Sequence, residues 1–407
     1  MSELDKTISK QTAGDGAAID PARLAALGGQ LTAAEILQQP AVWGQIESQA
    51  TQYGGALDSF LAPLLALPEL RIVLTGAGTS AFIGELLAPA MLATTARRVE
   101  AIATTDLVSG PQRYFQPGAP TLLVSFARSG SSPESVAAVA LADQLLPRVW
   151  HLVITCNPEG LLYRENRGRA NVFTVLLPDA THDRGFAMTT SFTSMLIAAA
   201  LAFGAIARAS DAIAAMSHAA ADVLARAMPL LHGLVARRFQ RVVYLGSNEL
   251  KALAREAALK LLELTDGQVV ALFDSPLGFR HGPKTIVDAQ TLVVVLLSND
   301  PQARRYDLDL LRELRNDGRA GRVLALSAQH DLAAGDDVFV LANAAAAADV
   351  ALALPMIVFC QVFALLQSLA LGIRPDTPSV SGTVNRVVSG VTIYPLSTTG
   401  GADVPGH

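Results

Sequence analysis

The sequence RIVLTGAGTS, residues 71–80, runs from an apolar, strand-forming segment straight into a glycine-rich turn. A helix-forming segment, residues 81–95, follows at once. The same order returns at residues 241–248, RVVYLGSN, ahead of a helical run at 249–264. A strand, a glycine turn and a helix in this order are typical of doubly wound α/β folds, in which ligands bind beyond the carboxyl ends of the strands.

Other apolar runs recur along the chain, which indicates that one structural unit occurs twice. TLLVSF at 121–126 is matched by TLVVVL at 291–296. Because such runs are continuously apolar and alternate with helical stretches, we expect parallel strands buried on both faces. The predicted fold is α/β, with two tandem doubly wound, flavodoxin-like domains. The predicted parts are an N-terminal segment that is partly disordered and then helical, the two domains, and a tail that closes the site: residues 1–49, 50–210, 225–375 and 376–407.

Composition and charge exclude several classes of function. Only 16% of the residues are charged, the net charge is −5 and no long Lys/Arg run occurs, so we expect no nucleic-acid or membrane partner. Cys156 and Cys360 lie far apart, and residues 1–18 lack a signal-peptide pattern, so we expect a cytoplasmic protein. Two apolar stretches, 191–207 and 350–373, lack flanking basic clusters, and we predict buried helices there.

Hydroxyl side chains gather at two predicted helix starts of the first unit. Thr79 and Ser80 follow the glycine turn, while Ser129, Ser131 and Ser132 follow the next strand. Helix N-terminal amides carry partial positive charge, so two such starts at one crevice predict a phosphate site. Serine and threonine also cap helices, so two well-capped helices are the alternative. The chain lacks the Gly-Lys-Ser/Thr and GxGxxG motifs, which argues against a nucleotide.

The second unit offers an acid–base pair instead of a phosphate cradle. Its turns, residues 246–248 and 298–300, lack the hydroxyl cluster, and Asp300 would repel a phosphate. Lys260 and Glu263 lie one turn apart on the next predicted helix, off its apolar stripe, where the lysine would keep the glutamate ionised as a base. An exposed ion pair is the alternative interpretation.

His281 lies in the loop RHGP, residues 280–283, after a predicted strand of the second unit. A histidine titrates near neutrality, which suits the opening of a sugar ring. No set of His, Asp, Glu and Cys shows the spacing of metal ligands, so we predict no metal and no other cofactor.

Four segments together resemble the sugar isomerase (SIS) family, and especially the isomerase half of glucosamine-6-phosphate synthase. They are the GAGTS turn, the ARSGSS loop at 127–132, the LKLLE segment at 259–263 and the RHGP loop. The resemblance covers nearly all of residues 50–395 and adds a separate line of support for the two-domain fold.

The resemblance implies a role for each matching residue. Ser80, Ser129 and Ser132 match phosphate-binding hydroxyls of the family. Glu263 matches the base that moves a proton between C1 and C2, and Lys260 matches a lysine beside that base. His281 matches the ring-opening histidine, which a neighbouring subunit often contributes.

Three segments depart from the synthase pattern. Ala127-Arg128 replaces Ser-Gln, the segment 385–392 has no match for the synthase's C-terminal lysine, and the segment 182–192 carries different side chains. The last two, with VTIYP at 391–395, look like the bacterial galactosamine-6-phosphate deaminase/isomerase group, which is also described as tagatose-6-phosphate ketose/aldose isomerase. The matching positions implied as further sugar contacts are Arg128, Thr189 and Arg386.

The resemblance implies an enzyme that converts galactosamine-6-phosphate to tagatose-6-phosphate and ammonia. It also implies a phosphorylated amino sugar as substrate and a homodimer or higher homo-oligomer. A ketose/aldose isomerase without deamination and a non-catalytic sugar-phosphate sensor are the alternatives, although a sensor does not need both Glu263 and His281. The galacto or gluco stereochemistry stays open, as does whether His281 acts in its own chain or across a subunit interface.

Overall fold

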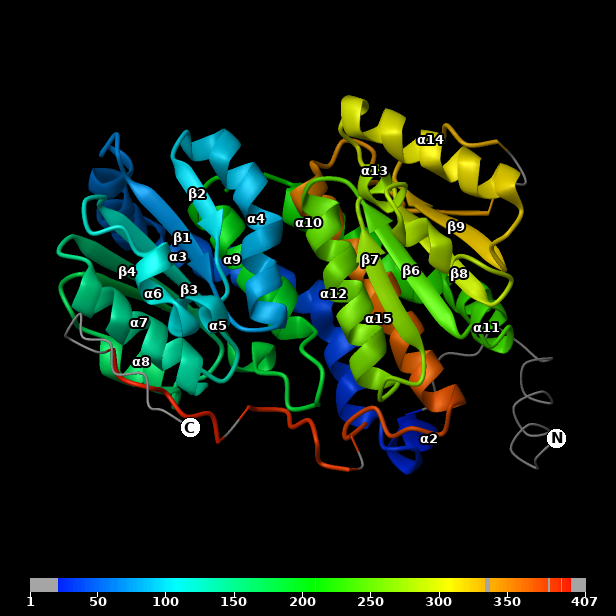
Figure 1. Cartoon of the computed structure of the whole chain (residues 1–407), viewed down its shortest axis with the longest axis horizontal. Coiled ribbons are helices and arrows are strands. Elements are labelled where there is room, and N and C mark those ends of the chain that lie inside the picture. Colours follow the sequence, from blue (N-terminus) through cyan, green and yellow to red (C-terminus); the bar gives the residue numbers. More distant parts are fainter. Residues whose placement is uncertain (1–20, 209, 334–336, 380, 389, 397–407) are drawn as a thin grey trace, which may run out of the picture.

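The protein folds into two α/β units that lie side by side, each built on one parallel sheet (Figure 1). The computed structural model describes residues 21–208, 210–333, 337–379, 381–388 and 390–396. The start of the predicted N-terminal segment, residues 1–20, lies outside the described residues.

The first sheet has five parallel strands in the order β2-β1-β3-β4-β5. Its central strands β1 and β3 are buried along their whole length, because their apolar side chains alternate between two helix-covered faces. The strand bounds are β1 Arg71–Thr75, β2 Arg98–Ala101, β3 Thr121–Ala127, β4 Val149–Thr155 and β5 Val172–Leu176.

The second sheet repeats this arrangement, in the order β7-β6-β8-β9-β10 and again with parallel pairing throughout. In both units the first strand lies between the second and the third, which confirms the predicted α/β class with two doubly wound sheets. The strand bounds are β6 Arg241–Gly246, β7 Val270–Asp274, β8 Thr291–Leu296, β9 Arg322–Ser327 and β10 Val338–Val340.

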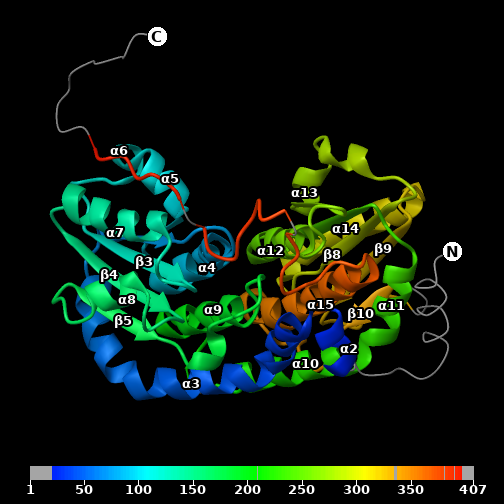
Figure 2. The same cartoon turned by 90° about the horizontal axis from the view of Figure 1, so that it is seen from below.

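Helices cover both faces of each sheet (Figure 2). In the first unit they are α4 Thr79–Thr95, α5 Thr104–Ser109, α6 Pro111–Tyr114, α7 Pro133–Leu145, α8 Leu161–Asn166, the 3₁₀ turn η1 Asp179–Thr181 and α9 Thr190–Ala202. In the second unit they are α12 Glu249–Leu264, α13 Pro276–Phe279, the 3₁₀ turn η2 Pro283–Ile286, α14 Pro301–Asp317 and α15 Asp349–Ala370.

The remaining helices join the two units. They are α2 Pro21–Ala26, α3 Gln30–Leu65, α10 Ala212–Arg226 and α11 Met228–Ala236. Helix α3 runs unbroken through the predicted boundary at residue 50, packs on α9, α10 and α15, and lies beneath both units in Figure 2. Its buried stripe, which includes Ile36, Trp43 and Leu57, belongs to one apolar cluster that extends through both units. The predicted boundary is therefore wrong as a structural division, because this stripe needs both units to cover it.

The two stretches that could be mistaken for membrane spans form core helices. Among the described residues, α15 is the one helix long and apolar enough to cross a membrane by length and composition, and the apolar window of that helix is completely buried inside the protein. Helix α9 is shorter, and Thr190 to Leu201 are all buried. Both helices are apolar all round because protein surrounds them on every side.

The two units meet where α4 packs along α12. Arg255 on α12 forms an ion pair of 2.5 Å with Glu85 on α4, and its guanidinium lies 4.3 Å from the centre of the Phe82 ring. This contact brings the helix after the GAGTS turn against the helix that carries Lys260 and Glu263.

Candidate active site

The glycine turn after β1 places the start of α4 at the carboxyl edge of the first sheet. Gly76 packs so closely on Ser80 that a Cβ at Gly76 would lie 2.6 Å from a backbone carbon of Ser80. Gly78 precedes the helix with a φ of 55°, which glycine adopts without strain. It has no side chain with which to cap α4, whose first residues Thr79 and Ser80 are buried.

The loop after β3 forms the second helix start. The amide of Asn157 donates a hydrogen bond of 2.8 Å to the Ser129 carbonyl, and the Ser131 hydroxyl accepts one of 3.2 Å from the Leu161 N–H. Ser132 is the N-cap residue of α7, but its hydroxyl donates to Ser135 Oγ at 2.7 Å and caps no helix amide. The capped-helix alternative is therefore wrong for both helix starts.

The sheet register brings these two loops together. Thr75 at the end of β1 pairs with Ser125 on the adjacent parallel strand β3, so both strands deliver their loops to the same edge. Adjacent strands lie about 4.8 Å apart, which is close enough for two loops to bind one phosphate. The five predicted hydroxyl residues thus share one edge of one sheet, at two helix starts without side-chain caps. This arrangement suits an anion.

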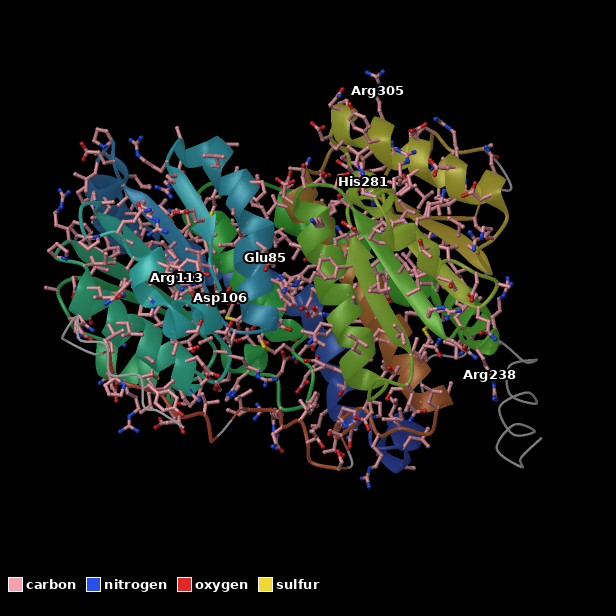
Figure 3. All side chains as sticks on the ribbon, viewed as in Figure 1. Glu85, Asp106, Arg113, Arg238, His281 and Arg305 are labelled. Atoms are coloured by element: carbon pink, nitrogen blue, oxygen red, sulfur yellow. The ribbon has the colours of Figure 1, made fainter. Side chains whose placement is uncertain are left out.

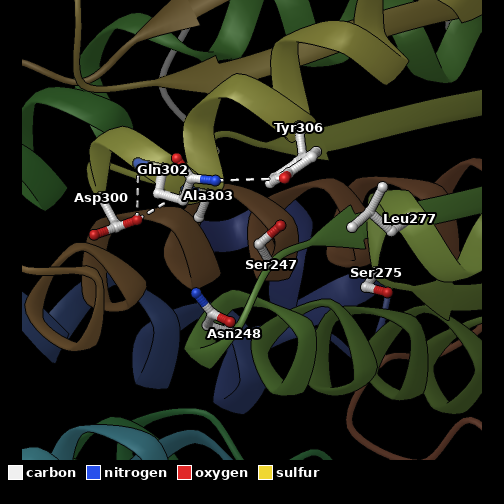
Figure 4. A pocket seen from close by; sticks show the side chains of 8 residues that line it. All are labelled: Ser247, Asn248, Ser275, Leu277, Asp300, Gln302, Ala303 and Tyr306. Carbon is white, nitrogen blue, oxygen red and sulfur yellow. Dashed lines mark hydrogen bonds between the residues drawn. The ribbon is translucent and has the colours of Figure 1, made fainter.

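The corresponding crevice of the second unit is built differently (Figure 4). A cavity of about 320 Å³ lies there between the starts of α12 and α14, with Ser247, Asn248 and Ser275 in its lining. The Asp300 carboxylate accepts hydrogen bonds from the Gln302 and Ala303 amides at the start of α14. The protein's own carboxylate therefore occupies the position where an anion would bind, which agrees with the expected repulsion of phosphate by Asp300.

Three charged residues lie along one face of α12: Glu256, Lys260 and Glu263. The Lys260 Nζ lies 2.5 Å from Glu263 Oε2 and 3.5 Å from Glu256 Oε1. The side chains of Glu256 and Lys260 are completely buried, whereas Glu263 keeps 24% of its side chain exposed. The alternative of a solvent-exposed ion pair is therefore wrong.

The electrostatics of this row of charges keeps Lys260 positively charged. Burial by itself would lower the pKa of Lys260, but the carboxylates of Glu256 and Glu263 raise it above its ordinary value. Burial raises the pKa of Glu256 to about 8, while Lys260 acts to lower it and Glu263 to raise it. The Lys260 ammonium thus interacts with two carboxyl groups, and it lies closer to that of Glu263 than to that of Glu256.

The start of α4 reaches this row directly. The Thr79 hydroxyl donates a hydrogen bond of 3.3 Å to Glu256 Oε1, so a residue of the predicted phosphate cradle touches the helix that carries the predicted base. Glu256 lies outside the motifs that carry the family resemblance. Its spacing of four residues from Lys260 and seven from Glu263 places all three on one helix face, and that spacing could have identified it.

The described hydrogen bonds of Arg128 go to backbone carbonyls. This buried guanidinium donates hydrogen bonds to the carbonyl of Phe186, at 3.1 Å, and to the carbonyl of Arg386 in the C-terminal tail. Arg386 in turn donates to the carbonyls of Asp183 and Gly185. These contacts hold the 183–186 segment and the tail in place, and the sugar contacts implied for Arg128 and Arg386 stay predictions.

Thr189 has a structural role as well. It is completely buried, its N–H donates to Asp183 at 2.8 Å, and its hydroxyl also contacts that carboxylate. Asp183 further accepts from the Thr190 and Ser191 amides and so caps α9. In this conformation Thr189 orders the start of α9, and the sugar contact implied for it stays a prediction.

Two titratable groups near this segment were not found from the sequence. Glu35 on α3 accepts hydrogen bonds from the Arg184 and Gly185 amides, and burial, together with the Asp183 charge, raises the pKa of Glu35 to about 7. His182 is half-buried, and burial and the charges of Arg386 and Arg128 lower its pKa. Glu35 lies in no recognisable motif, and His182, which begins the 182–192 segment, had no role assigned to it, so only the fold reveals their surroundings.

His281 lies at the other end of α12 from Glu263. Glu263 is fourteen residues beyond Glu249, the first residue of α12, which is about 21 Å at 1.5 Å per residue. Leu277, four residues before His281, lines the crevice at the start of α12. His281 itself is exposed in the loop beside α13 (Figure 3), on the side of the second unit where α12 starts, whereas Glu263 lies near the end of that helix.

Salt bridges anchor the His281 loop to α14. Arg280 pairs with Asp309 and Glu313, each at 2.8 Å, and Lys284 pairs with Asp317 at 2.5 Å. These contacts hold the histidine on the outer surface of the second unit. In the part of the chain that the structure describes, no three His, Cys, Asp or Glu side chains are grouped to hold a metal ion.

Comparisons with known proteins agree with this architecture. The SIS domain family matches residues 65–205. An AgaS protein of Streptomyces coelicolor is 50% identical over 376 residues, 90% of this chain and 96% of that protein. The D-galactosamine-6-phosphate deaminase AgaS of Escherichia coli is 47% identical over 373 residues, 91% of this chain and 97% of that protein.

A solved structure shows the same relationship in three dimensions. The crystal structure of tagatose-6-phosphate ketose/aldose isomerase from Escherichia coli superimposes with a TM-score of 0.85 and 43% identity, over 94% of this chain and 99% of that chain. The predicted resemblance to SIS sugar-phosphate isomerases is thereby confirmed. The close relatives span almost the whole chain, and the protein therefore belongs to the AgaS family of SIS-domain proteins.

Proposed function

We propose that this protein isomerises and deaminates an amino-sugar 6-phosphate, converting galactosamine-6-phosphate to tagatose-6-phosphate and ammonia. The relatives over 90% of the chain are named as D-galactosamine-6-phosphate deaminases. The observation that carries the proposal is the packing of α4, which starts at the phosphate cradle, against α12, which carries the Lys260–Glu263 pair. An anion site and a base thus meet where the two units join.

The phosphate occupies the cradle at the starts of α4 and α7. Two helix starts and the hydroxyls of Ser80, Ser129 and Ser132 supply partial positive charge and hydrogen-bond donors to its oxygens. The Asp300 cap prevents the same binding in the second unit. One anion site per chain fixes the sugar by its 6-phosphate and extends its carbon chain toward α12.

Glu263 acts as the base. It takes the proton from C2 of the open-chain amino aldose and returns it at C1, while the C2 nitrogen loses a proton and the C1 oxygen gains one, which leaves an imine at C2 and a hydroxyl at C1. Water adds to that imine and releases ammonia, and C2 becomes the ketone of tagatose-6-phosphate. Lys260 pairs with the Glu263 carboxylate before the transfer, and the exposed part of the Glu263 side chain gives the substrate access to the carboxylate.

His281 opens the sugar ring from a neighbouring subunit in this proposal. Glu263 of the same chain lies near the far end of α12, and the loop that carries His281 is exposed on the outer surface of the second unit. A homodimer or higher oligomer would bring this histidine to the partner's cradle. His182, which burial and nearby arginines keep neutral, is the candidate within the same chain.

One assay separates the proposed reaction from its rivals. The purified protein is incubated with galactosamine-6-phosphate and with glucosamine-6-phosphate, and ammonia and ketose phosphate are both measured. The proposal expects both products, with galactosamine-6-phosphate preferred. An aldose phosphate without an amino group is tested in parallel. If it yields ketose phosphate while neither amino sugar releases ammonia, the protein is a ketose/aldose isomerase, the activity in the name of the 43%-identical structure. Binding without any turnover would indicate a sensor.

A further inference from the structure

Glu256 is a buried carboxyl group to which the proposed reaction assigns no role. Its side chain is completely buried, and its Oε2 atom has no hydrogen-bond partner among the described residues. Its Oε1 atom lies between the Thr79 hydroxyl, at 3.3 Å, and the Lys260 ammonium, at 3.5 Å. It therefore stands between the anion cradle and the base.

The charges around Glu256 favour its neutral form. On α12, Lys260 is the one cation shared by two carboxyl groups, and it lies 1.0 Å closer to Glu263 (2.5 Å) than to Glu256 (3.5 Å). On α4, the Thr79 hydroxyl is the group that touches Glu256, and Glu85 pairs instead with Arg255. On α15, the carboxylate is Asp349, which bonds to Ser298 and Asn299.

The strands and the loop behind α12 add no counter-charge to Glu256. On β6 the titratable group is the Tyr244 phenol, and burial raises the pKa of that phenol. On β7 the Asp274 carboxylate lies 4.0 Å from Lys251. Arg128 acts on Lys260 through its charge and makes no described contact with Glu256. A fully buried carboxylate without its own counter-ion is costly, and burial raises its pKa to about 8.

We propose that Glu256 is a positioning residue that, as a neutral carboxylic acid, fixes Thr79 and Lys260 and lets the sugar phosphate enter beside it. In this form it accepts the Thr79 hydrogen bond without adding negative charge next to the cradle. Because it is neutral, it does not compete with the Glu263 carboxylate for the Lys260 ammonium. Once ionised, it would compete for Lys260 and repel the phosphate. The inference rests on the proposed phosphate site, but it does not require turnover.

Ligand binding tests the inference separately from catalysis. The probe is galactitol 6-phosphate, which has no amino group and no carbonyl, and whose phosphate is already dianionic above pH 7. Its Kd is measured by calorimetry at pH 7, 8 and 9 for wild type, Glu256→Gln and Glu85→Gln. The glutamine is a neutral mimic of the acid. Glu85→Gln is the matched control, because it removes a carboxylate from the same α4–α12 contact but leaves Thr79 and Lys260 alone.

We expect the wild-type Kd to rise about tenfold between pH 7 and pH 9, the scale of one added like charge nearby. Glu256→Gln should bind within a few fold of wild type at pH 7 and change by less than about twofold up to pH 9, while Glu85→Gln should follow wild type. A Glu256→Gln variant that weakens with pH as much as wild type, or that has already lost more than about tenfold affinity at pH 7, would overturn the inference.

Two further measurements separate this role from a merely structural one. Because the folded pKa of Glu256 lies above its unfolded value, its protonated form stabilises the fold below about pH 4.5, and this stability is lost as pH rises through about 8. The melting temperature of Glu256→Gln minus that of wild type should therefore increase from pH 5 to pH 8, and a flat difference would contradict the neutral acid.

Kinetics provides the second measurement. Glu256→Ala should lower kcat for galactosamine-6-phosphate by more than about tenfold, and Glu256→Gln should recover most of that loss at pH 7. Equal losses in both variants would contradict the proposal. If wild type shows no turnover while the pH-dependent binding behaves as expected, the proposed function fails and the role of Glu256 in binding stands.

Discussion

The Lys260 ammonium lies 2.5 Å from the Glu263 carboxylate, one turn away on α12, and the lysine side chain is completely shielded from solvent. Surface pairs of this spacing contribute little, because water screens them and both side chains move. Burial removes that screening, so this pair positions the Glu263 carboxylate on the helix that packs against α4 of the first unit. This contact supports the proposed role of Glu263 as the base.

Replacing the base should affect turnover far more than binding. Glu263→Gln keeps the size of the side chain and its contact with Lys260 but cannot accept the C2 proton. We expect kcat for ammonia release to fall about 10²–10⁴-fold. The Kd for galactitol 6-phosphate should stay within about threefold of wild type, because the cradle is untouched. A variant with wild-type kcat would exclude Glu263 as the base.

The separation of Glu263 and His281 gives a complementation test. Glu263→Gln and His281→Ala are each expected to be nearly inactive. If the partner supplies the histidine, mixed dimers of the two variants contain one intact site, and an equal mixture should regain up to roughly a quarter of wild-type activity. Refolding or co-expression produces the mixture, and ammonia release is the readout.

The result separates the two candidate histidines. No recovery in verified mixed dimers would contradict a histidine that acts across the interface. An active His281→Ala together with an inactive His182→Ala would place ring opening within one chain, at the half-buried histidine beside Arg128 and Arg386.

The N-cap side chain binds no helix amide at the start of α7 but binds two at the start of α14. Removing it should therefore affect substrate binding in the first case and stability in the second. Ser132→Ala should raise the KM for galactosamine-6-phosphate about tenfold, because a hydrogen bond to a charged group contributes about 1.5–3 kcal/mol. Its melting temperature should change little, because the Ser132 hydroxyl caps no amide.

Asp300→Ala is the matched variant in the second unit. This residue caps α14 through two amides, so its loss should reduce the free energy of unfolding by about 1 kcal/mol. It should leave the KM unchanged. Thermal melts and steady-state kinetics on both variants check the pair of expectations, and a raised KM in Asp300→Ala would show that the second crevice also binds the substrate.

Glu35 predicts a pH effect on stability. Its folded pKa of about 7 lies above the value of 4.5 for an ordinary glutamate, chiefly because it is buried. The stability that its protonated form contributes is complete below about pH 4.5 and is lost as pH rises through about 7. Glu35→Gln keeps an acceptor for the Arg184 and Gly185 amides without this titration.

We expect the free energy of unfolding of Glu35→Gln, relative to wild type, to increase between pH 5 and pH 8 by up to roughly 3 kcal/mol. Urea melts at several pH values measure this difference. Glu47→Gln, at a half-buried position of the same helix, is the control and should show a much smaller change. A pH-independent difference for Glu35→Gln would mean that Glu35 stays ionised in the folded protein.

The sequence by itself determined the fold class and indicated the two hydroxyl-rich helix starts. Continuous apolar runs followed by glycine turns are local patterns, and they indicate parallel strands and helix starts without reference to the rest of the chain. The hydroxyl residues from Thr79 to Ser132 and the Lys260–Glu263 spacing are equally local. These predictions depend on the chemistry of neighbouring residues, and such chemistry can be read directly from a sequence.

Tertiary structure alone decided which residues meet. The burial of Lys260, the bond from Thr79 to Glu256, and the use of Arg128, Thr189 and Arg386 to hold backbone segments all join parts of the chain that a sequence does not bring together. The opposite placement of His281 and Glu263 follows from the length and direction of α12. Burial, pKa and reach depend on the packing of distant segments, so they emerge only when the two units fold against each other.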